Sequence, residues 1–227
     1  MATINITCLA LLSDLDGTLI DSARCVDYAW ENWAVSHKLD VEWIKKSAHG
    51  MRTADSLKFI APHLNLETEM ARLEDLECDC TDGLVPINGA QTLLTSLSSA
   101  RWAIVTSGSN RLANHRLGYV GLPRPSVFIT ADDVSVGKPE PQCYLLAAGG
   151  LGVNPSDCVV LEDSPAGIKA GKAAGATVIA IGVSSADHDI SAADYVVHDL
   201  SKIKVQSRSE GQMDGTISLT LDIDGSR

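Results

Sequence analysis

The stretch Ser13-Asp14-Leu15-Asp16-Gly17-Thr18 directly follows an apolar run over residues 4–12. That run has the length and composition of a buried β-strand. Residues two apart on an extended chain project to the same side, so Asp14 and Asp16 can face one point while Leu15 turns away. Gly17 permits a sharp exit from the strand. Two carboxylates at one point repel each other, and a hard cation such as Mg²⁺ would relieve that repulsion. An ordinary Asp-Gly turn after a strand has the same residues, so the choice between a turn and a metal site depends on the rest of the chain.

The composition limits both the size of the fold and the kinds of partner. The chain has 227 residues, 45% of them hydrophobic, which suits one sizeable domain or a core with a smaller insert. Its net charge of −11 makes nucleic acid and anionic membranes unsuitable partners for the general surface. The first twelve residues contain no basic residue, and their apolar run is too short to span a bilayer. We therefore expect a cytoplasmic protein with reduced cysteines, and we expect a monomer.

The periodicity divides the chain into a helical segment and an alternating one. Residues 21–83 contain no strand-like run, and their apolar residues recur at helical spacing. Within them, a helix predicted over residues 67–80 is strongly acidic, which predicts a solvated face. From Leu84 onward, helical stretches alternate with short apolar runs at residues 102–106, 127–130, 158–161, 178–181 and 195–197. Such alternation predicts a parallel sheet covered by helices on both faces.

These patterns predict an α/β core from residues 1–20 and 84–205, with a helical insert over residues 21–83. Residues 206–227 form a C-terminal extension. In that extension, the alternation of Ile217, Leu219 and Leu221 predicts one further strand after a polar linker.

Polar side chains follow the predicted strands at the points where the strands end. Ser107-Gly108 follows residues 102–106, Lys138 lies shortly after residues 127–130, and Glu162-Asp163 follows residues 158–161. Because ligands bind beyond the carboxyl ends of parallel strands, we expect these groups to converge with Asp14 and Asp16.

Charge and size suggest a role for each group. Ser107 and the backbone N–H groups around Gly108 can hold phosphate oxygens at a helix N-terminus. Lys138 can neutralise a nucleophile and a phosphoryl group together, and Asp163 supplies a third carboxylate for a metal, with Glu162 beside it. Each feature alone has an ordinary explanation, such as a helix cap or a solvated lysine. The four features in this order favour a site.

These features resemble the motifs of the haloacid dehalogenase superfamily of phosphohydrolases. Asp14-Leu-Asp-Gly-Thr18 resembles the first motif, Ser107 the second, Lys138 the third and Glu162-Asp163 the fourth. The helical insert resembles that superfamily's small cap, so the resemblance implies a Rossmann-like parallel-sheet core with an inserted all-α cap. The resemblance extends to about Val205. Three further stretches are similar to the fungal glycerol phosphatase and 2-deoxyglucose-6-phosphate phosphatase group: Ala48-His-Gly-Met-Arg-Thr53, Phe128-Ile-Thr-Ala-Asp132 and Glu162-Asp-Ser-Pro-Ala-Gly167.

The resemblance implies a Mg²⁺-dependent phosphomonoester hydrolase that works through an aspartyl-phosphate. Asp14 would attack phosphorus. Asp16 would protonate the leaving alkoxide and then deprotonate the hydrolytic water. Ser107 and Lys138 would hold the phosphoryl oxygens, with Lys138 also acting in catalysis.

The resemblance also implies the metal ligands. Mg²⁺ would lie between Asp14, the backbone carbonyl of Asp16 and Asp163, with Glu162 acting behind them or through water.

The substrate implied is a small phosphorylated sugar or polyol, bound by the cap loop His49-Gly50-Met51-Arg52. Arg52 would donate hydrogen bonds to a polyol or to a second anionic group, with His49 and Gly50 beside it. Met51 stands where the fungal group often has tryptophan, which leaves the exact substrate open. A sugar phosphomutase of the same fold is one alternative, and it needs a second phosphate site for which Arg52 is the clear candidate. A non-catalytic metabolite-binding protein is another, although both Asp14 and Asp16 are present.

Overall fold

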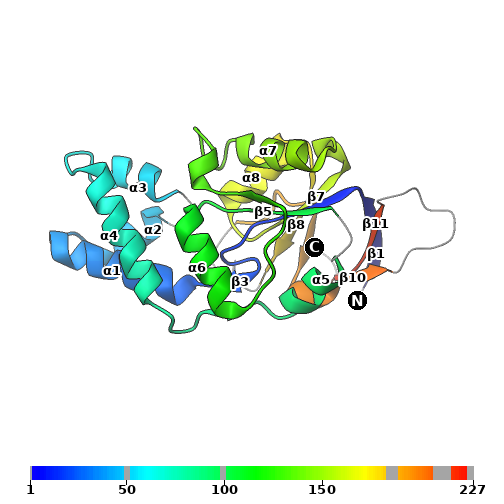
Figure 1. Cartoon of the computed structure of the whole chain (residues 1–227), viewed down its shortest axis with the longest axis horizontal. Coiled ribbons are helices and arrows are strands. Elements are labelled where there is room, and N and C mark those ends of the chain that lie inside the picture. Colours follow the sequence, from blue (N-terminus) through cyan, green and yellow to red (C-terminus); the bar gives the residue numbers. More distant parts are fainter. Residues whose placement is uncertain (1, 49–51, 98–100, 183–188, 207–215, 224–227) are drawn as a thin grey trace.

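A parallel sheet forms the centre of the computed structural model, which describes residues 2–48, 52–97, 101–182, 189–206 and 216–223 (Figure 1). Its strand order is β6-β5-β2-β7-β8-β9, and every pairing in it is parallel. The strands are β2 (Ala10–Ser13), β5 (Trp102–Val105), β6 (Val127–Ile129), β7 (Cys158–Glu162), β8 (Thr177–Ile181) and β9 (Tyr195–Val197). The predicted α/β class and parallel sheet are confirmed.

Helices cover the two faces of this sheet and bury alternate strand residues (Figure 1). Leu11 belongs to the apolar cluster shared with α5 (Ala90–Ser96) and α6 (Asn110–Val120). Leu12, its neighbour, belongs to the cluster shared with α7 (Gln142–Leu151) and α8 (Pro165–Ala173). Two cores therefore form from continuous apolar strands, because successive side chains point to opposite faces. Short 3₁₀ turns lie at Ala131–Asp133, Pro155–Asp157 and Leu200–Lys202.

The N-terminal apolar run is two strands rather than the single core strand predicted over residues 4–12. β1 (Ala2–Cys8) belongs to a separate antiparallel sheet of order β1-β11-β10, whereas β2 begins at Ala10. β1 alternates between exposed and more buried residues, but β2 is buried throughout. Alternation is typical of a half-buried antiparallel strand and continuity of a buried parallel one, so the two strands have the burial that their sheets require.

The C-terminal strand is present as predicted. β11 (Ile217–Ile223) pairs along one side with β1 and along the other with β10 (Ile203–Gln206). Ile217, Leu219 and Leu221 are buried in the same core as α5. The extension therefore contributes to packing rather than to the site.

The inserted helices are α1 (Ala23–His37), α2 (Val41–Ala48), α3 (Thr53–Ile60) and α4 (Leu66–Asp79). They enclose an apolar centre that contains Trp30, Trp33 and Leu73, whereas Trp43 is about half exposed at 48%. Where the chain enters and leaves this cap, β3 (Ile20–Asp21) pairs antiparallel with β4 (Val85–Pro86). Among the described helices, none is long and apolar enough to cross a bilayer.

The acidic helix α4 has the predicted solvated face, but two of its acidic residues are buried. Glu67 and Asp75 are exposed, but Glu69 and Glu77 are buried. Glu69 accepts a hydrogen bond from Trp33 Nε1 at 2.7 Å inside the cap. Glu77 instead pairs with the core, because α4 packs against α6.

We expect Leu219→Ala to lower the free energy of unfolding by about 2–5 kcal/mol, because it leaves a cavity where β11 packs on the core. Urea unfolding would measure the loss. Lys204→Ala is the control, since Lys204 makes an exposed ion pair with Asp222 in the same sheet and should cost less than about 1 kcal/mol. Equal losses in the two variants would contradict a packing role for β11.

Candidate active site

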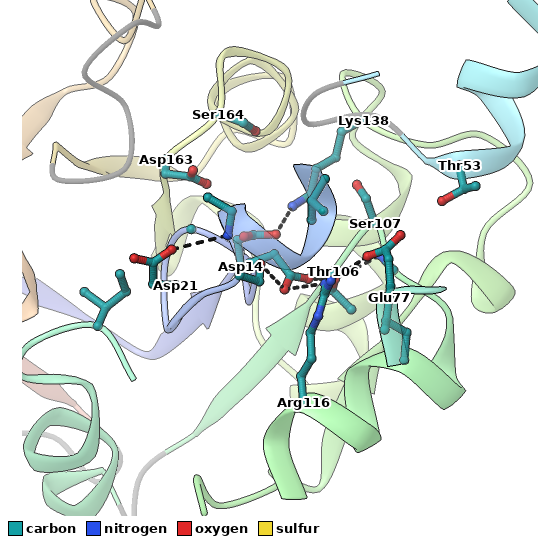
Figure 2. Close-up of a pocket in the computed structure, with 18 of the residues that line it drawn as sticks. Asp14, Asp21, Thr53, Glu77, Thr106, Ser107, Arg116, Lys138, Asp163 and Ser164 are labelled. Carbon is teal, nitrogen blue, oxygen red and sulfur yellow. Dashed lines mark hydrogen bonds and ion pairs between the residues drawn. The ribbon is translucent and has the colours of Figure 1, made fainter. Parts of the chain in front are cut away.

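A cavity of about 320 Å³ lies between the cap and the carboxyl edge of the sheet (Figure 2). The core contributes residues that follow β2, β5 and β7, together with Lys138 and two residues of α6. The cap and its connections contribute the opposite wall. The lining residues include Asp14, Asp16, Asp21, Ser22, Trp30, Thr53, Glu77, Thr106, Ser107, Gly108, Arg116, Lys138 and Asp163. The predicted convergence of groups after different strands is present.

Lys138 connects two buried carboxylates. Its Nζ donates to Asp14 Oδ1 at 2.6 Å, to Glu162 Oε1 at 2.5 Å and to the Val105 carbonyl at 3.2 Å. All three donor positions of the ammonium are thus used. Burial raises the pKa of Asp14 to about 7, although Lys138 opposes this. Among the described residues, none donates to Asp14 Oδ2, which leaves that oxygen available on the pocket side.

Glu162 is held behind the pocket rather than in it. Its Oε2 accepts from the backbone N–H groups of Asp163 and Ser164, and its Oε1 also accepts from the Tyr144 hydroxyl at 2.8 Å. A Cβ at Gly167 would lie 1.7 Å from Oε1, so only glycine leaves room for this carboxylate. Glu162 therefore fixes Lys138 and does not face a ligand.

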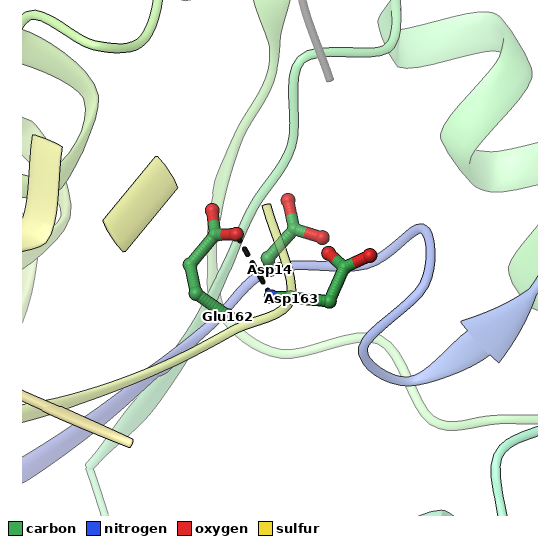
Figure 3. A group of neighbouring side chains, drawn as sticks. All are labelled: Asp14, Glu162 and Asp163. Atoms are coloured by element: carbon green, nitrogen blue, oxygen red, sulfur yellow. Dashed lines mark hydrogen bonds between the residues drawn. The ribbon is translucent and has the colours of Figure 1, made fainter. Parts of the chain in front are cut away.

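Asp163 is the carboxylate best suited to a cation. One carboxylate oxygen from each of Asp14, Glu162 and Asp163 lies within 4.8 Å of the other two (Figure 3). Burial, and then the charge of Asp14, raises the pKa of Asp163 well above its usual range. Its one hydrogen bond among the described side chains is a long one from Thr18 Oγ1 at 3.4 Å. A Cβ at Gly17 would lie 2.1 Å from Asp163 Oδ2, so the first motif leaves space for this group. Buried oxygen donors with excess negative charge fit a hard divalent cation.

Asp16 lies on the other side of Asp14 and is held by three donors. Arg116 donates to its Oδ1 at 2.6 Å and the Ser22 hydroxyl donates to the same oxygen at 2.8 Å. Thr106 Oγ1 lies 3.4 Å from Oδ2. Leu15 turns into the core, as the two-residue spacing predicts.

Ser107 faces the pocket at the start of α6 (Figure 2). Its hydroxyl finds no hydrogen-bond partner among the residues that the structure describes. The helix is capped by Ser109, whose Oγ accepts from the Leu112 N–H, so capping does not account for Ser107. The Gly108 N–H donates to Thr106 Oγ1 at 3.0 Å. Ser107 is thus the free polar group at this helix terminus.

Arg52 lies beside the pocket-lining Thr53 but does not itself line the cavity. Its guanidinium donates to both carboxylate oxygens of Asp55 and to the carbonyls of Val134 and Ser135. The bonds to the two carbonyls attach the cap to the core, whereas those to Asp55 lie within the cap. The other two residues predicted for the substrate, His49 and Gly50, lie outside the described residues.

The sequence interpretation missed Arg116, Glu77 and Thr106. Arg116 Nη2 bonds Glu77 Oε2 at 2.5 Å across the contact between α6 and α4. Burial acts to lower the pKa of Arg116, but the charges of Asp16 and Glu77 outweigh it and raise the pKa. The available signal was the position of Arg116 in the helix that follows Ser107, about two turns from the start of that helix.

A parallel sheet with carboxylates and a lysine at its carboxyl edge, closed by a helical cap, suits a phosphoryl-transfer enzyme of the α/β type. Residues 9–175 match the family model of the haloacid dehalogenase-like hydrolases. The chain belongs to that family, which confirms the resemblance seen in its four motifs.

Curated relatives extend this assignment over most of the chain. Hexitol phosphatase A of Escherichia coli (strain K12) is 43% identical over 91% of this chain and 98% of its own length. Glycerol-1-phosphate phosphohydrolase 2 of Saccharomyces cerevisiae is 37% identical over 76% and 74%, respectively. From the same yeast, 2-deoxyglucose-6-phosphate phosphatase 2 is 36% identical over 88% and 91%. The expected similarity to that fungal group is confirmed, and the chain is a phosphatase.

A solved structure supports the fold. The β-phosphoglucomutase from Clostridium difficile superposes with a TM-score of 0.72 over 87% of this chain and 93% of its own. Its identity to this chain is 24%, so the likeness concerns the fold alone.

We expect Lys138→Met to lower the free energy of unfolding by about 3–5 kcal/mol, because it leaves Asp14 and Glu162 buried without their cation. Urea unfolding at neutral pH would measure this loss. The double variant Lys138→Met/Glu162→Gln removes one of the two stranded charges and should recover part of it. A double variant no more stable than Lys138→Met would show that Lys138 does not balance Glu162.

Proposed function

We propose that this protein is a Mg²⁺-dependent phosphomonoester hydrolase that releases phosphate from small sugar or polyol phosphates through an aspartyl-phosphate. One observation carries the proposal: Asp14 has one oxygen fixed by Lys138 and the other unbonded within the described structure, with Asp16 in the same pocket. A nucleophile and an acid–base group within one pocket are what a two-step displacement requires.

In the first step, Asp14 Oδ2 attacks phosphorus and the bond from phosphorus to the substrate oxygen breaks. Asp16 gives its proton to that leaving oxygen, so a neutral alcohol departs. Lys138 holds Asp14 Oδ1 at 2.6 Å and keeps the attacking oxygen oriented. In the second step, Asp16 takes a proton from water, which attacks the phosphorus of the aspartyl-phosphate. Phosphate leaves, and the Asp14 carboxylate and the Asp16 acid are restored.

The phosphoryl oxygens would be bound by the free Ser107 hydroxyl and the α6 N-terminus. Lys138, whose three donor positions are used by Asp14, Glu162 and the Val105 carbonyl, would attract the phosphoryl group through its charge. Asp14, Asp163 and the Asp16 carbonyl would hold Mg²⁺. When bound, the cation offsets the charge of the phosphoryl group and of the carboxylates. Glu162 takes part only through Lys138, to which it is bonded at 2.5 Å.

The far wall of the cavity favours an uncharged polyhydroxyl chain. Asp21, Glu77, Ser22 and Thr53 offer acceptors and hydroxyl groups to such a chain, and Trp30 offers an apolar surface. A volume of about 320 Å³ is near the lower end of the roughly 300–1,000 Å³ typical of ligand pockets. The names of the curated relatives, a hexitol phosphatase and phosphatases of glycerol 1-phosphate and 2-deoxyglucose 6-phosphate, support the same substrate class.

The phosphomutase alternative needs a second phosphate site, and the described pocket offers no cation that is free to form one. Lys138 and Arg116, the cations of its described lining, are each bonded to two carboxylates. Arg52 is bonded to Asp55 and to backbone carbonyls of the core. Hydrolysis is therefore the better proposal. The cytoplasmic location and the monomeric state stay predictions.

We expect Mg²⁺-dependent phosphate release from one or a few monophosphates in a panel of glycerol, hexitol, hexose and 2-deoxyglucose phosphates. A bisphosphate such as glucose 1,6-bisphosphate should show a kcat/KM at least about tenfold lower, because placing like charges together costs several kcal/mol. Asp14→Asn should reduce release more than about 10³-fold, because it removes the nucleophile. Circular dichroism would confirm that this variant is folded.

Other outcomes of the panel have distinct meanings. Isomerisation of glucose 1-phosphate without net release would identify a mutase. Mg²⁺ binding without turnover of any ester would favour the binding-protein alternative.

We expect Mg²⁺ at about 100 times its Kd to stabilise the fold by about 2.7 kcal/mol, through binding to the native state alone. A protein of this size would then melt at least about 5 °C higher. Asp163→Asn should lose most of this shift, whereas Asp222→Asn, an exposed carboxylate of the outer sheet, should keep it. Differential scanning calorimetry at constant ionic strength would measure both. An Asp163→Asn variant with the full shift would place the cation elsewhere.

A further inference from the structure

Arg116 joins the acid–base carboxylate of the core to a carboxylate of the cap (Figure 2). Its Nη1 lies 2.6 Å from Asp16 Oδ1, and its Nη2 lies 2.5 Å from Glu77 Oε2. The Arg116 side chain is 2% exposed and that of Glu77 is 6% exposed. The contact thus crosses the boundary between α6 and α4 within the wall of the pocket.

The two oxygens of Asp16 have different surroundings. Oδ1 accepts from both Arg116 and the Ser22 hydroxyl, whereas Oδ2 has only Thr106 Oγ1 at 3.4 Å. Oδ1 cannot turn away from its position without breaking a charge-assisted hydrogen bond to the guanidinium. Oδ2 is therefore the less restrained oxygen of Asp16 and the one left for a reacting group.

We propose that Arg116 is a positioning residue for Asp16: it fixes the carboxyl group through Oδ1, leaves Oδ2 for the reacting group, and makes this arrangement depend on the docking of Glu77 from the cap. This inference rests on the proposed function, in which Asp16 donates and then accepts that proton. Arginine suits the role because its planar fork can serve two carboxylates at once, which a lysine ammonium on a flexible stem does less well.

Stability alone does not explain the buried bridge. Burying an ion pair costs desolvation that its attraction often fails to recover. Arg116 Nε is also buried without a partner among the described residues, which adds to that cost. The same two helices already have an exposed connection, in which Arg111 of α6 pairs with Glu74 and Asp75 of α4. The cap thus also docks on α6 through contacts that do not involve Arg116.

The test compares two substrates whose leaving groups differ in their need for a proton. A defect in proton donation affects only one of them, whereas a folding defect affects both. A polyol phosphate needs a proton on its leaving oxygen, whereas p-nitrophenyl phosphate has a leaving group that departs without one. For Arg116→Met, rapid mixing should show the first step on a polyol phosphate slowed about 10²-fold, within the usual range for general acid catalysis. The burst of p-nitrophenol from p-nitrophenyl phosphate should slow less than about threefold, and KM for both esters should change little.

Two further variants make the test specific. Arg111→Met removes the exposed ion pairs between the same helices and should leave both rates unchanged. Arg116→Lys keeps the positive charge but lacks the planar fork, so it should slow the first step on the polyol phosphate about tenfold more than on p-nitrophenyl phosphate. If Arg116→Met does not fold, Arg116→Lys is used in its place.

The outcomes are distinguishable from failure of the proposed function. Equal slowing of both esters, or a change confined to KM, would overturn the positioning role while leaving the hydrolase intact. Wild-type protein that turns over neither ester in Mg²⁺ would overturn the proposed function and this inference with it. A leaving-group difference in the Arg116 variants, absent from Arg111→Met, would establish the role.

Discussion

Mutual repulsion among three buried carboxylates is the constraint on which the site depends. Parallel pairing of β2 with β7 brings Asp14 beside Glu162 and Asp163, with oxygens within 4.8 Å of one another. The single positive charge of Lys138 is paired with two of these carboxylates, so it cannot offset all of the negative charge. An excess negative charge remains in a medium that solvates it poorly, which is why the pKa values of Asp14 and Asp163 rise. The arrangement of the strands thus produces an excess negative charge that a cation would offset. Gly17, which has no Cβ, leaves the space that the Asp163 carboxylate occupies.

The cap is attached to this core by charges as well as by the chain. The net charge of −11 is not spread evenly over a solvated surface, because α4 directs acidic residues toward two arginines of α6. Arg111 makes its pairs in solvent, where water screens such contacts and makes them weak. Arg116 makes its pair inside the pocket and holds Asp16 Oδ1 at 2.6 Å. Arg52 adds a third connection through the backbone carbonyls of Val134 and Ser135. In the part of the chain that the structure describes, the cap side of the pocket therefore presents neutral and acidic groups.

The parts of the site that the sequence predicted are those determined by local geometry. Asp14, Lys138 and Asp163 follow strands, so the position of each strand end places them without knowledge of any distant contact. Arg116 and Glu77 could not be predicted in this way, because each looks like an ordinary surface charge on its helix. Their contact joins residues 39 apart in the chain, and Arg116 reaches Asp16 across 100 residues. The break between β1 and β2 was obscured for a similar reason, since the partner of β1 is the strand at the far end of the chain.

In the reaction that we propose, one carboxyl group must donate a proton in the first step and accept one in the second. The two oxygens of a free carboxyl group can exchange places by rotation about the Cβ–Cγ bond. Each such rotation would move the proton away from the phosphoryl group. The fork of Arg116 restricts that freedom by keeping Oδ1 bonded, while Oδ2 has only the long contact with Thr106. Because the other arm of the fork is bonded to Glu77, separation of the cap would remove one of the two carboxylates that hold the guanidinium. The orientation of Asp16 is in this way connected to the position of the cap through one side chain, in addition to the β3–β4 pair through which the chain enters and leaves the cap.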